Sequence, residues 1–463
     1  MTSLRRWASP VDVGLLGAIV VLAGTLRAVG AGSGLPLPLL NPDEANIVPR
    51  AWQLVHGGGL DPGWYDYPSL LFVLLAPTQI GLEQPSYGTA RVAAIALGLI
   101  GVIAAWWLGR IAVGRLSAAI CALVVAVATT HVAYSRMAVT DIALTAGVTV
   151  CLVLLVSGRL EWAGVAAGLA ASAKYPGVLL VVPLAVAGYG AWRRLAVSAA
   201  LAAAAFLATS PFVVIHADDA WDDFRRVQLL ARDGWLGFED DPPTPLAFGL
   251  RLWETVGPVA LVAVAGLAVA LRRRRRTDLI LLSFAAVYAL SLLGSSAHFD
   301  RYVLPLVPVV AVLATRVPPL AVVTVAAALV PLWWATDDAR TLTTHDARLD
   351  AAAWIDANVP LTDRLAADPS TLPLTTRPVT RLELPGPGRH FDIDRDLERL
   401  RASRVRWLVV GGSVTDRVLA ATRDYPREAR FYRSLGSLTP AFAVKGRQGR
   451  EPRPWLRIYR IYP

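Results

Sequence analysis

Long apolar runs separated by short polar turns dominate the first two thirds of the chain. A membrane-spanning α-helix needs about 20 apolar residues, with roughly 17 as a lower limit. Eleven runs approach this length: 11–29, 91–109, 116–135, 142–157, 161–173, 177–191, 195–215, 256–271, 278–294, 302–315 and 318–335. The pattern predicts an α-helical polytopic membrane protein with about 11 transmembrane helices, the first of which acts as a signal anchor.

The positive charges between the runs predict how the chain is oriented. Cytoplasmic turns are rich in arginine and lysine. If the N-terminus with Arg5 and Arg6 is cytoplasmic, every second turn should be basic, and these turns hold Arg110, Arg115, Arg159, Arg193, Arg194, the run 272–276 and Arg316. The C-terminus then lies outside the cytoplasm, and residues 30–90 and 216–252 form two large external loops.

One further apolar stretch, 69–81, is too short to cross a membrane comfortably. Counting it as a span would also place the later arginine-rich turns on the wrong side. We therefore expect it to form an interfacial or re-entrant helix at the outer surface.

The composition of the sequence changes near residue 337, where charged residues become frequent and long apolar runs end. Residues 344–360 are typical of a helix that stops near Pro360, and 413–426 of a helix capped by Ser413 or Thr415. The stretches 405–412 and 455–462 are typical of strands. We expect a transmembrane domain over 1–336 and a small soluble extracytoplasmic α/β domain over 337–463.

Composition supports a membrane protein. Hydrophobic residues make up 55% of the 463 positions, which a soluble globular chain seldom reaches. The net charge of +10 does not indicate nucleic-acid binding, because the arginines gather at the ends of apolar runs. Cys121 and Cys151 both lie inside apolar runs, which predicts neither a disulfide framework nor a zinc cluster.

Ionisable residues gather at the external ends of the predicted spans, where they indicate function by default. Asp43 and Glu44 lie in the first part of the first external loop. The other candidates are Asp66, Tyr67, Arg136, Asp141, Lys174, His298 and Arg301. A carboxylate in such a site can take the proton of an acceptor hydroxyl, and arginine or lysine can hold a phosphate. A sugar joined to a lipid through phosphate is a donor that would lie at this surface.

Each candidate also has a structural interpretation. Asp43 can cap the helix that begins near Glu44, and Glu44 can be a solvated charge at that helix start. Arg136 and Asp141 can form an ion pair between two helix ends. Lys174, one of only two lysines in the chain, can extend its ammonium group to the membrane surface.

Five stretches resemble the GT-C glycosyltransferases, in particular the group of protein O-mannosyltransferases and lipid A aminoarabinose transferases (family 39/83-like). DEANIVPRAWQL resembles their first-loop Asp-Glu motif, and YDYPSLLFVLL resembles the later part of that loop. The other three are AYSRMAVTDIALT, GLAASAKYPGVLLVVPL and DRYVLPLVPVVAVLA. The resemblance covers roughly residues 40–315. Two positions depart from the family pattern: Asp66 and Tyr67 precede Pro68 where a basic residue is common, and Tyr175 stands where glycine is common.

The resemblance implies an inverting membrane glycosyltransferase with Asp43 as the catalytic base. We expect the other eight candidates to bind substrate. The resemblance also implies a polyprenyl-phosphate sugar as donor and a glycan, lipid or protein as acceptor, at the external face of the plasma membrane. A divalent metal is compatible with the sequence but not required by it.

Two other functions fit the sequence. A multi-span transporter or flippase of a lipid-linked sugar would have charges near the middle of the membrane, broken helices and internal repeats. A catalytically inactive scaffold would keep the same carboxylates without turnover.

Overall fold

The computed structural model describes residues 9–344, 346–369, 371, 377–446 and 454–462. Arg5 and Arg6, on which the predicted orientation partly rests, lie outside the described residues. Each of the eleven apolar runs falls on a helical segment. The helices of this part are α1 (Pro10–Ala28), α4 (Tyr87–Ala112), α5 (Arg115–Val127), α6 (Thr129–Ser135), α7 (Thr140–Val156), α8 (Leu160–Ala173), η3 (Tyr175–Leu180), α9 (Val181–Ala187), α10 (Trp192–Thr209), α11 (Phe212–Ile215), α13 (Thr244–Val256), α14 (Val259–Arg273), α15 (Arg276–Leu292), η4 (Asp300–Leu306), α16 (Val307–Ala314), η5 (Pro318–Leu320) and α17 (Ala321–Leu342).

Length and composition support fewer spans than the eleven predicted. Among the described residues, three helical stretches are long and apolar enough to cross a membrane: Pro10–Ala28, Tyr87–Ala112 and one within Pro318–Asn358. Two bent pairs also qualify when each is counted as one span, α5 with α6 at 62° and α13 with α14 at 113°. The remaining apolar helices are shorter, so the number of eleven spans stays a prediction.

Small residues bring these helices into close contact. A Cβ atom added at Gly164 would lie 2.1 Å from the Ser198 carbonyl oxygen, and one at Gly168 would lie 2.1 Å from that of Ala202. Helices α8 and α10 therefore pack backbone against backbone, as small residues allow in membrane proteins. Away from such contacts, large apolar side chains such as Val11, Val92 and Val322 face outward.

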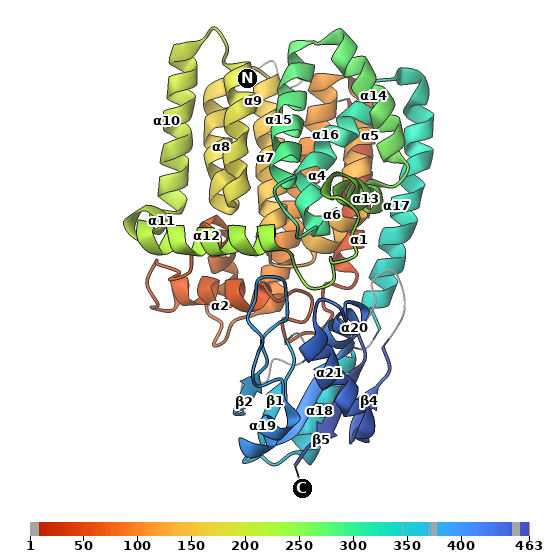
Figure 1. Ribbon diagram of the computed structural model, residues 1–463. Helices are drawn as coiled ribbons and strands as arrows, with labels where there is room; N and C mark the ends of the chain where they lie inside the picture. Colours follow the sequence, from red (N-terminus) through yellow and green to blue (C-terminus); the bar gives the residue numbers. More distant parts are fainter. Residues whose placement is uncertain (1–8, 345, 370, 372–376, 447–453, 463) are drawn as a thin grey trace.

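The first predicted loop folds into three short helices: α2 (Glu44–Val55), α3 (Leu70–Leu75) and η2 (Ala76–Gln79). The last two occupy the stretch 69–81, and Leu70–Gln79 is among the apolar helices too short to span. The second predicted loop, 216–252, contains α12 (Ala217–Asp233) and most of α13, so it is largely helical. Helices α2 and α12 lie across one end of the bundle, between it and the C-terminal domain (Figure 1).

The C-terminal domain is a three-layer α/β module. Its strands are β1 (Arg364–Ala367), β2 (Val379–Arg381), β3 (Val405–Gly411), β4 (Phe442–Val444) and β5 (Leu456–Arg460), in the order β2-β1-β3-β5-β4. β1 pairs in parallel with β2 and β3, whereas β5 pairs antiparallel with β3 and β4. Its helices are α18 (Ala347–Asn358), α19 (Leu397–Ala402), α20 (Gly412–Ala420), α21 (Pro426–Ser434) and η6 (Leu435–Ser437).

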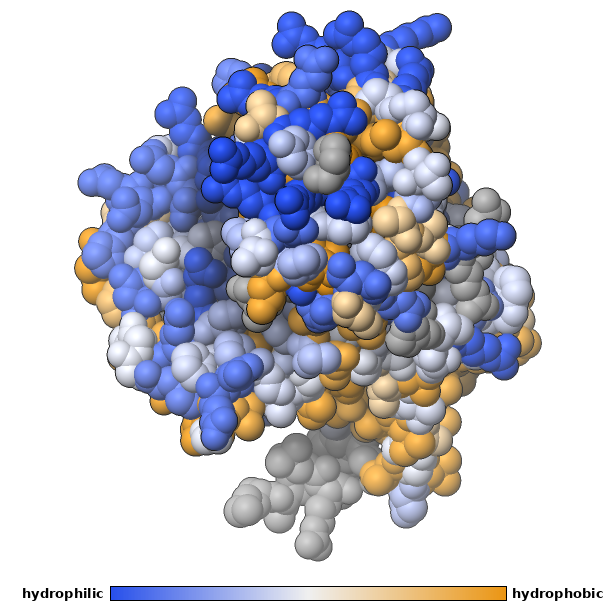
Figure 2. Space-filling view, turned by 90° about the horizontal axis from the view of Figure 1, so that it is seen from below, coloured by the Kyte–Doolittle hydropathy of each residue, from blue (hydrophilic) through white to orange (hydrophobic). Residues whose placement is uncertain are grey.

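Alternating side chains of β3 fill two cores. Leu408 and Val410 belong to the cluster that includes residues of α20 and α21, and Trp407 and Val409 belong to the cluster that includes residues of α18. This is the period-2 alternation expected of a strand covered on both faces. Viewed from the end that carries this domain, the surface is largely hydrophilic (Figure 2).

Helix α17 continues to Leu342, five residues past the start predicted for the second domain. One local prediction for this region was wrong. Helix α20 begins at Gly412 with Gly411 at its N-cap, so Ser413 and Thr415 lie within the helix and do not cap it. The strand β3 runs directly into α20, which leaves no room for a polar cap.

Candidate active site

Asp43 stands at the N-cap position of α2, but its side chain makes no capping hydrogen bond. Its carboxylate oxygen Oδ2 instead accepts a hydrogen bond of 3.2 Å from the Tyr67 hydroxyl. The backbone N–H of Asp43 donates to Asn41 Oδ1 at 2.9 Å, which fixes the chain just before the helix. Capping therefore does not explain this carboxylate, and Tyr67 orients it.

Arg301 lies between two carboxylates. Its Nη1 is 3.8 Å from Asp43 Oδ2, and its Nε is 3.9 Å from Asp141 Oδ2. Both separations exceed a hydrogen bond. Lys174 Nζ, by contrast, lies 2.6 Å from Asp141 Oδ1. Four charged groups from the first loop and from helix ends far apart in the sequence thus meet in one place.

Aromatic rings line this cluster. The ammonium group of Lys174 lies 5.4 Å from the ring centres of both Tyr67 and Tyr302. The guanidinium of Arg301 lies 4.6 Å from the ring centre of Phe299. Such faces attract cations and partly compensate for their removal from water.

The two carboxylates of the cluster differ in access. The Asp43 side chain is 25% exposed, whereas that of Asp141 is 4% exposed. Asp141 is also held by Lys174 in a short ion pair. Asp43 is therefore the more accessible of the two carboxylates, and Arg301 is the cation of this cluster that is not committed to a short ion pair.

The residue before Arg301 fixes its backbone. Asp300 accepts hydrogen bonds from the Tyr134 hydroxyl at 2.9 Å and from the Arg301 N–H at 2.8 Å. Tyr302 and Tyr134 were not predicted as site residues, although both stand inside stretches that resemble the GT-C motifs. Tyr302 directly follows Arg301, and Tyr134 stands two residues before Arg136.

Glu44 lies outside this cluster. It is fully buried, and its two carboxylate oxygens accept hydrogen bonds from Arg91 at 2.9 and 2.7 Å. One of them also accepts from the Ala138 N–H at 3.0 Å. These contacts favour a structural role over the expected binding of substrate, because both ends of the pair are closed to solvent.

Asp66 forms an ion pair with Arg226 of α12, which also pairs with Asp223 at 2.9 Å. Burial and the nearby Asp223 raise the pKa of the Asp66 carboxyl above its ordinary value, against the opposing effect of Arg226. Asp66 is thus tied to the second loop. Arg226 of the second loop is the basic residue that forms this ion pair.

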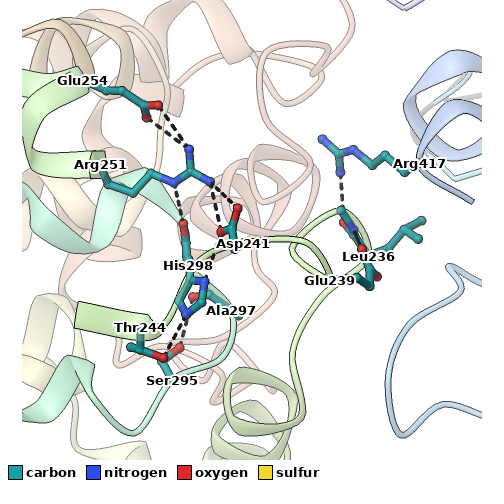
Figure 3. Close-up of polar contacts among 11 residues, drawn as sticks. Leu236, Glu239, Asp241, Thr244, Arg251, Glu254, Ser295, Ala297, His298 and Arg417 are labelled. Carbon is teal, nitrogen blue, oxygen red and sulfur yellow. Dashed lines mark hydrogen bonds and ion pairs between the residues drawn. The ribbon is translucent and has the colours of Figure 1, made fainter. Parts of the chain in front are cut away.

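Two other candidates make polar contacts with residues outside the cluster. Arg136 is fully buried and donates to the Leu26 carbonyl oxygen at 2.7 Å. His298 places Nδ1 3.0 Å from Asp241 Oδ2 and Nε2 3.1 Å from the Thr244 hydroxyl (Figure 3). Both of its ring nitrogens are therefore engaged by the second loop.

No metal site is evident in the part of the chain that the structure describes, where no three His, Cys, Asp or Glu side chains are placed to hold an ion. His216, in the second loop, lies 3.1 Å from Asp61 in the first loop. The cluster around Asp43 contains a carboxylate that can accept a proton and cations that can bind an anion.

Comparison with known structures shows a GT-C fold. The oligosaccharyltransferase of Archaeoglobus fulgidus tethered to an acceptor peptide is 13% identical, with a TM-score of 0.61 over 93% of this chain and 72% of that chain. ArnT from Cupriavidus metallidurans bound to undecaprenyl phosphate is 15% identical, with a TM-score of 0.58 over 97% and 98% of the two chains. No curated protein matches the chain by sequence.

The model of glycosyltransferase family 87 matches residues 64–296, half of the chain. The matched part contains Asp66, Asp141 and Lys174 but neither Asp43 nor Arg301. The resemblance to the GT-C superfamily seen in the sequence motifs is confirmed. The chain belongs to glycosyltransferase family 87 and is a membrane glycosyltransferase of the GT-C type.

Proposed function

We propose that this protein moves a sugar from a polyprenyl-phosphate donor to an acceptor hydroxyl, with inversion, at the external membrane face. The observation that carries the proposal is the accessible Asp43 carboxylate next to the Arg301 guanidinium, 3.8 Å away. A base and a phosphate-binding cation are the two groups that such a transfer needs.

In the proposed reaction Asp43 accepts the proton of the acceptor hydroxyl. The oxygen attacks the anomeric carbon of the sugar, and the bond from that carbon to the phosphate oxygen breaks. The electron pair leaves with the polyprenyl phosphate, which gains one negative charge. A single displacement inverts the configuration at the anomeric carbon.

Arg301 and Lys174 stabilise the charge that develops on the phosphate. Arg301 offers a planar fork that matches two phosphate oxygens. Lys174 supplies a second charge, which Asp141 holds in place at 2.6 Å. Because the leaving phosphate is already a weak base, no strong general acid is needed.

The donor class is supported by the fold relatives. One of them, ArnT, was determined bound to undecaprenyl phosphate. The Archaeoglobus fulgidus enzyme was determined with dolichol-phosphate and an inhibitory peptide. The acceptor of the present chain is a glycan, lipid or protein hydroxyl.

The external location rests on the arginine pattern. The five arginines 272–276 span the end of α14, the turn after it and the start of α15, and this turn lies at the end of the bundle opposite α2 and the C-terminal domain (Figure 1). If this turn is cytoplasmic, Asp43 and the C-terminal domain are extracytoplasmic and the N-terminus is cytoplasmic.

A donor panel tests the proposal. The protein in lipid nanodiscs is given radiolabelled sugars linked to polyprenol through one phosphate, with membrane extract as acceptor source, and matched diphosphate-linked sugars serve as controls. We expect transfer from a monophosphate donor, release of polyprenyl phosphate, and an anomeric configuration opposite to that of the donor. Transfer with retention, or only from diphosphate donors, would overturn the proposal.

A further inference from the structure

The segment Trp235–Asp241, here called the clasp, lies between the C-terminal domain and residues 295–302, which carry Arg301. It follows α12 and precedes α13. Its side chains face two ways. Leu236 and Glu239 contact the C-terminal domain, whereas Phe238 and Asp241 contact residues 298–299.

On the domain side the clasp is part of a core. Leu236 is 1% exposed and belongs to the hydrophobic cluster that lies under α20 and α21. Its carbonyl oxygen accepts a hydrogen bond of 3.4 Å from Arg417 (Figure 3). The Tyr425 hydroxyl donates to Glu239 at 2.6 Å. A leucine buried in a core fixes the position of its segment relative to that core.

On the side that faces the transmembrane helices, the clasp contacts His298 through Asp241. Asp241 Oδ2 lies 3.0 Å from His298 Nδ1 and 3.2 Å from Arg251 Nη2. Arg251 in turn donates from Nε to the His298 carbonyl oxygen at 3.1 Å (Figure 3). One carboxylate thus holds both the side chain and, through Arg251, the backbone of the residue three positions before Arg301.

Aromatic contacts continue this connection to Arg301 itself. The rings of Trp235 and Phe238 pack edge-on against Phe299, with centres 5.6 and 5.1 Å away. Arg301 stacks on Phe299 at 4.6 Å. Trp235 also contacts the C-terminal domain, where the guanidinium of Arg389 lies 4.5 Å from its ring centre.

We propose that the clasp makes the C-terminal domain a positioning element for Arg301, with Leu236 and Asp241 as its two anchor points. The contribution to catalysis rests on the proposed function, but the mechanical coupling does not. A change that frees the clasp from the C-terminal domain should loosen residues 295–301 while the sheet domain stays folded.

Amide hydrogen exchange measures this coupling directly. The N–H groups of Ser296 and Ala297 both donate to the Ala231 carbonyl oxygen, at 2.9 and 3.0 Å. Their exchange therefore reports whether the segment before Arg301 remains fastened. We compare the full-length wild type with Leu236→Asn and with a control, Leu438→Asn, which alters a partly buried leucine of the same cluster outside the clasp.

We expect Leu236→Asn to speed exchange at Ser296 and Ala297, and to weaken binding of undecaprenyl phosphate about 5-fold or more. Leu438→Asn should change neither the amide exchange of these two residues nor the binding of undecaprenyl phosphate. The milder variant Asp241→Asn should also speed exchange at Ser296 and Ala297 with the C-terminal domain intact. Leu236→Met, which keeps an apolar side chain, should exchange at the wild-type rate. Unchanged exchange in Leu236→Asn and Asp241→Asn would overturn the coupling. If wild type binds no lipid phosphate, the proposed function fails, yet the exchange result still decides the coupling.

Discussion

Arg301 lies 3.8 Å from Asp43, close enough for strong attraction but beyond a hydrogen bond. The proposed base and the proposed phosphate-binding cation are therefore neighbours that form no direct hydrogen bond. In a transferase of this kind the separation matters, because each group must be available to a different part of the substrates.

Replacing Arg301 tests its role as the phosphate-binding cation. Arg301→Lys keeps the charge but loses the planar fork, and Arg301→Gln loses both. We expect undecaprenyl phosphate binding to weaken in the order wild type, Lys, Gln, with a loss of about 10- to 100-fold for Gln. Titration calorimetry in nanodiscs measures this order.

A matched control for that series is Arg225→Gln, an exposed arginine of α12. It changes the net charge equally but should leave binding unchanged. Equal weakening by Arg225→Gln would show that general surface charge, and not Arg301, attracts the lipid.

The fully buried pair of Glu44 and Arg91 should matter for stability. Glu44→Gln leaves the Arg91 charge buried without its carboxylate, a change that costs about 3–5 kcal/mol. We expect a clearly lower thermal midpoint for Glu44→Gln, whereas Glu83→Gln, at an exposed site in the same loop, should match wild type. Differential scanning fluorimetry measures these midpoints. If Glu44 were a solvated charge, Glu44→Gln and Glu83→Gln would unfold at the same temperature.

The raised pKa of Asp66 predicts a dependence of stability on pH. The folded protein binds a proton on the Asp66 carboxyl more tightly than the unfolded chain does. Protonation of Asp66 therefore stabilises the fold fully below its ordinary pKa of about 4, and this stabilisation is lost as pH rises through the pKa of Asp66 in the folded protein. As pH rises above about 4, wild type should lose stability relative to Asp66→Asn. Thermal midpoints of both proteins across this range measure the difference, and parallel curves would contradict it.

Much of the architecture could be predicted from the sequence, because apolar runs and strand alternation are local signals. The apolar runs fall on helices, and both strands and both helices predicted after residue 337 are present. The number of spans could not be settled in this way. A run such as 116–135 reads as one helix, but it bends by 62° between α5 and α6, and such a bend depends on tertiary packing.

The site shows a similar division. Asp43, Tyr67, Asp141, Lys174 and Arg301 meet as the topology suggested. Glu44 follows Asp43 directly, but successive helical residues point about 100° apart, so its side chain turns inward to Arg91. Arg91 is the first residue of the apolar run 91–109. This position was the sequence signal that Arg91 could be a buried partner of Glu44. His298 is held by Asp241, a pairing between distant loops that no local pattern reveals.

The most direct test of the central claim compares Asp43→Asn with wild type and with Glu83→Gln in a single-turnover transfer assay. Undecaprenyl phosphate binding is measured on the same samples, so that loss of catalysis is separated from loss of folding. If Asp43 is the base, Asn in its place should lower transfer by about 100- to 10,000-fold, with lipid binding retained and Glu83→Gln fully active. Transfer by Asp43→Asn at the wild-type rate would contradict the account.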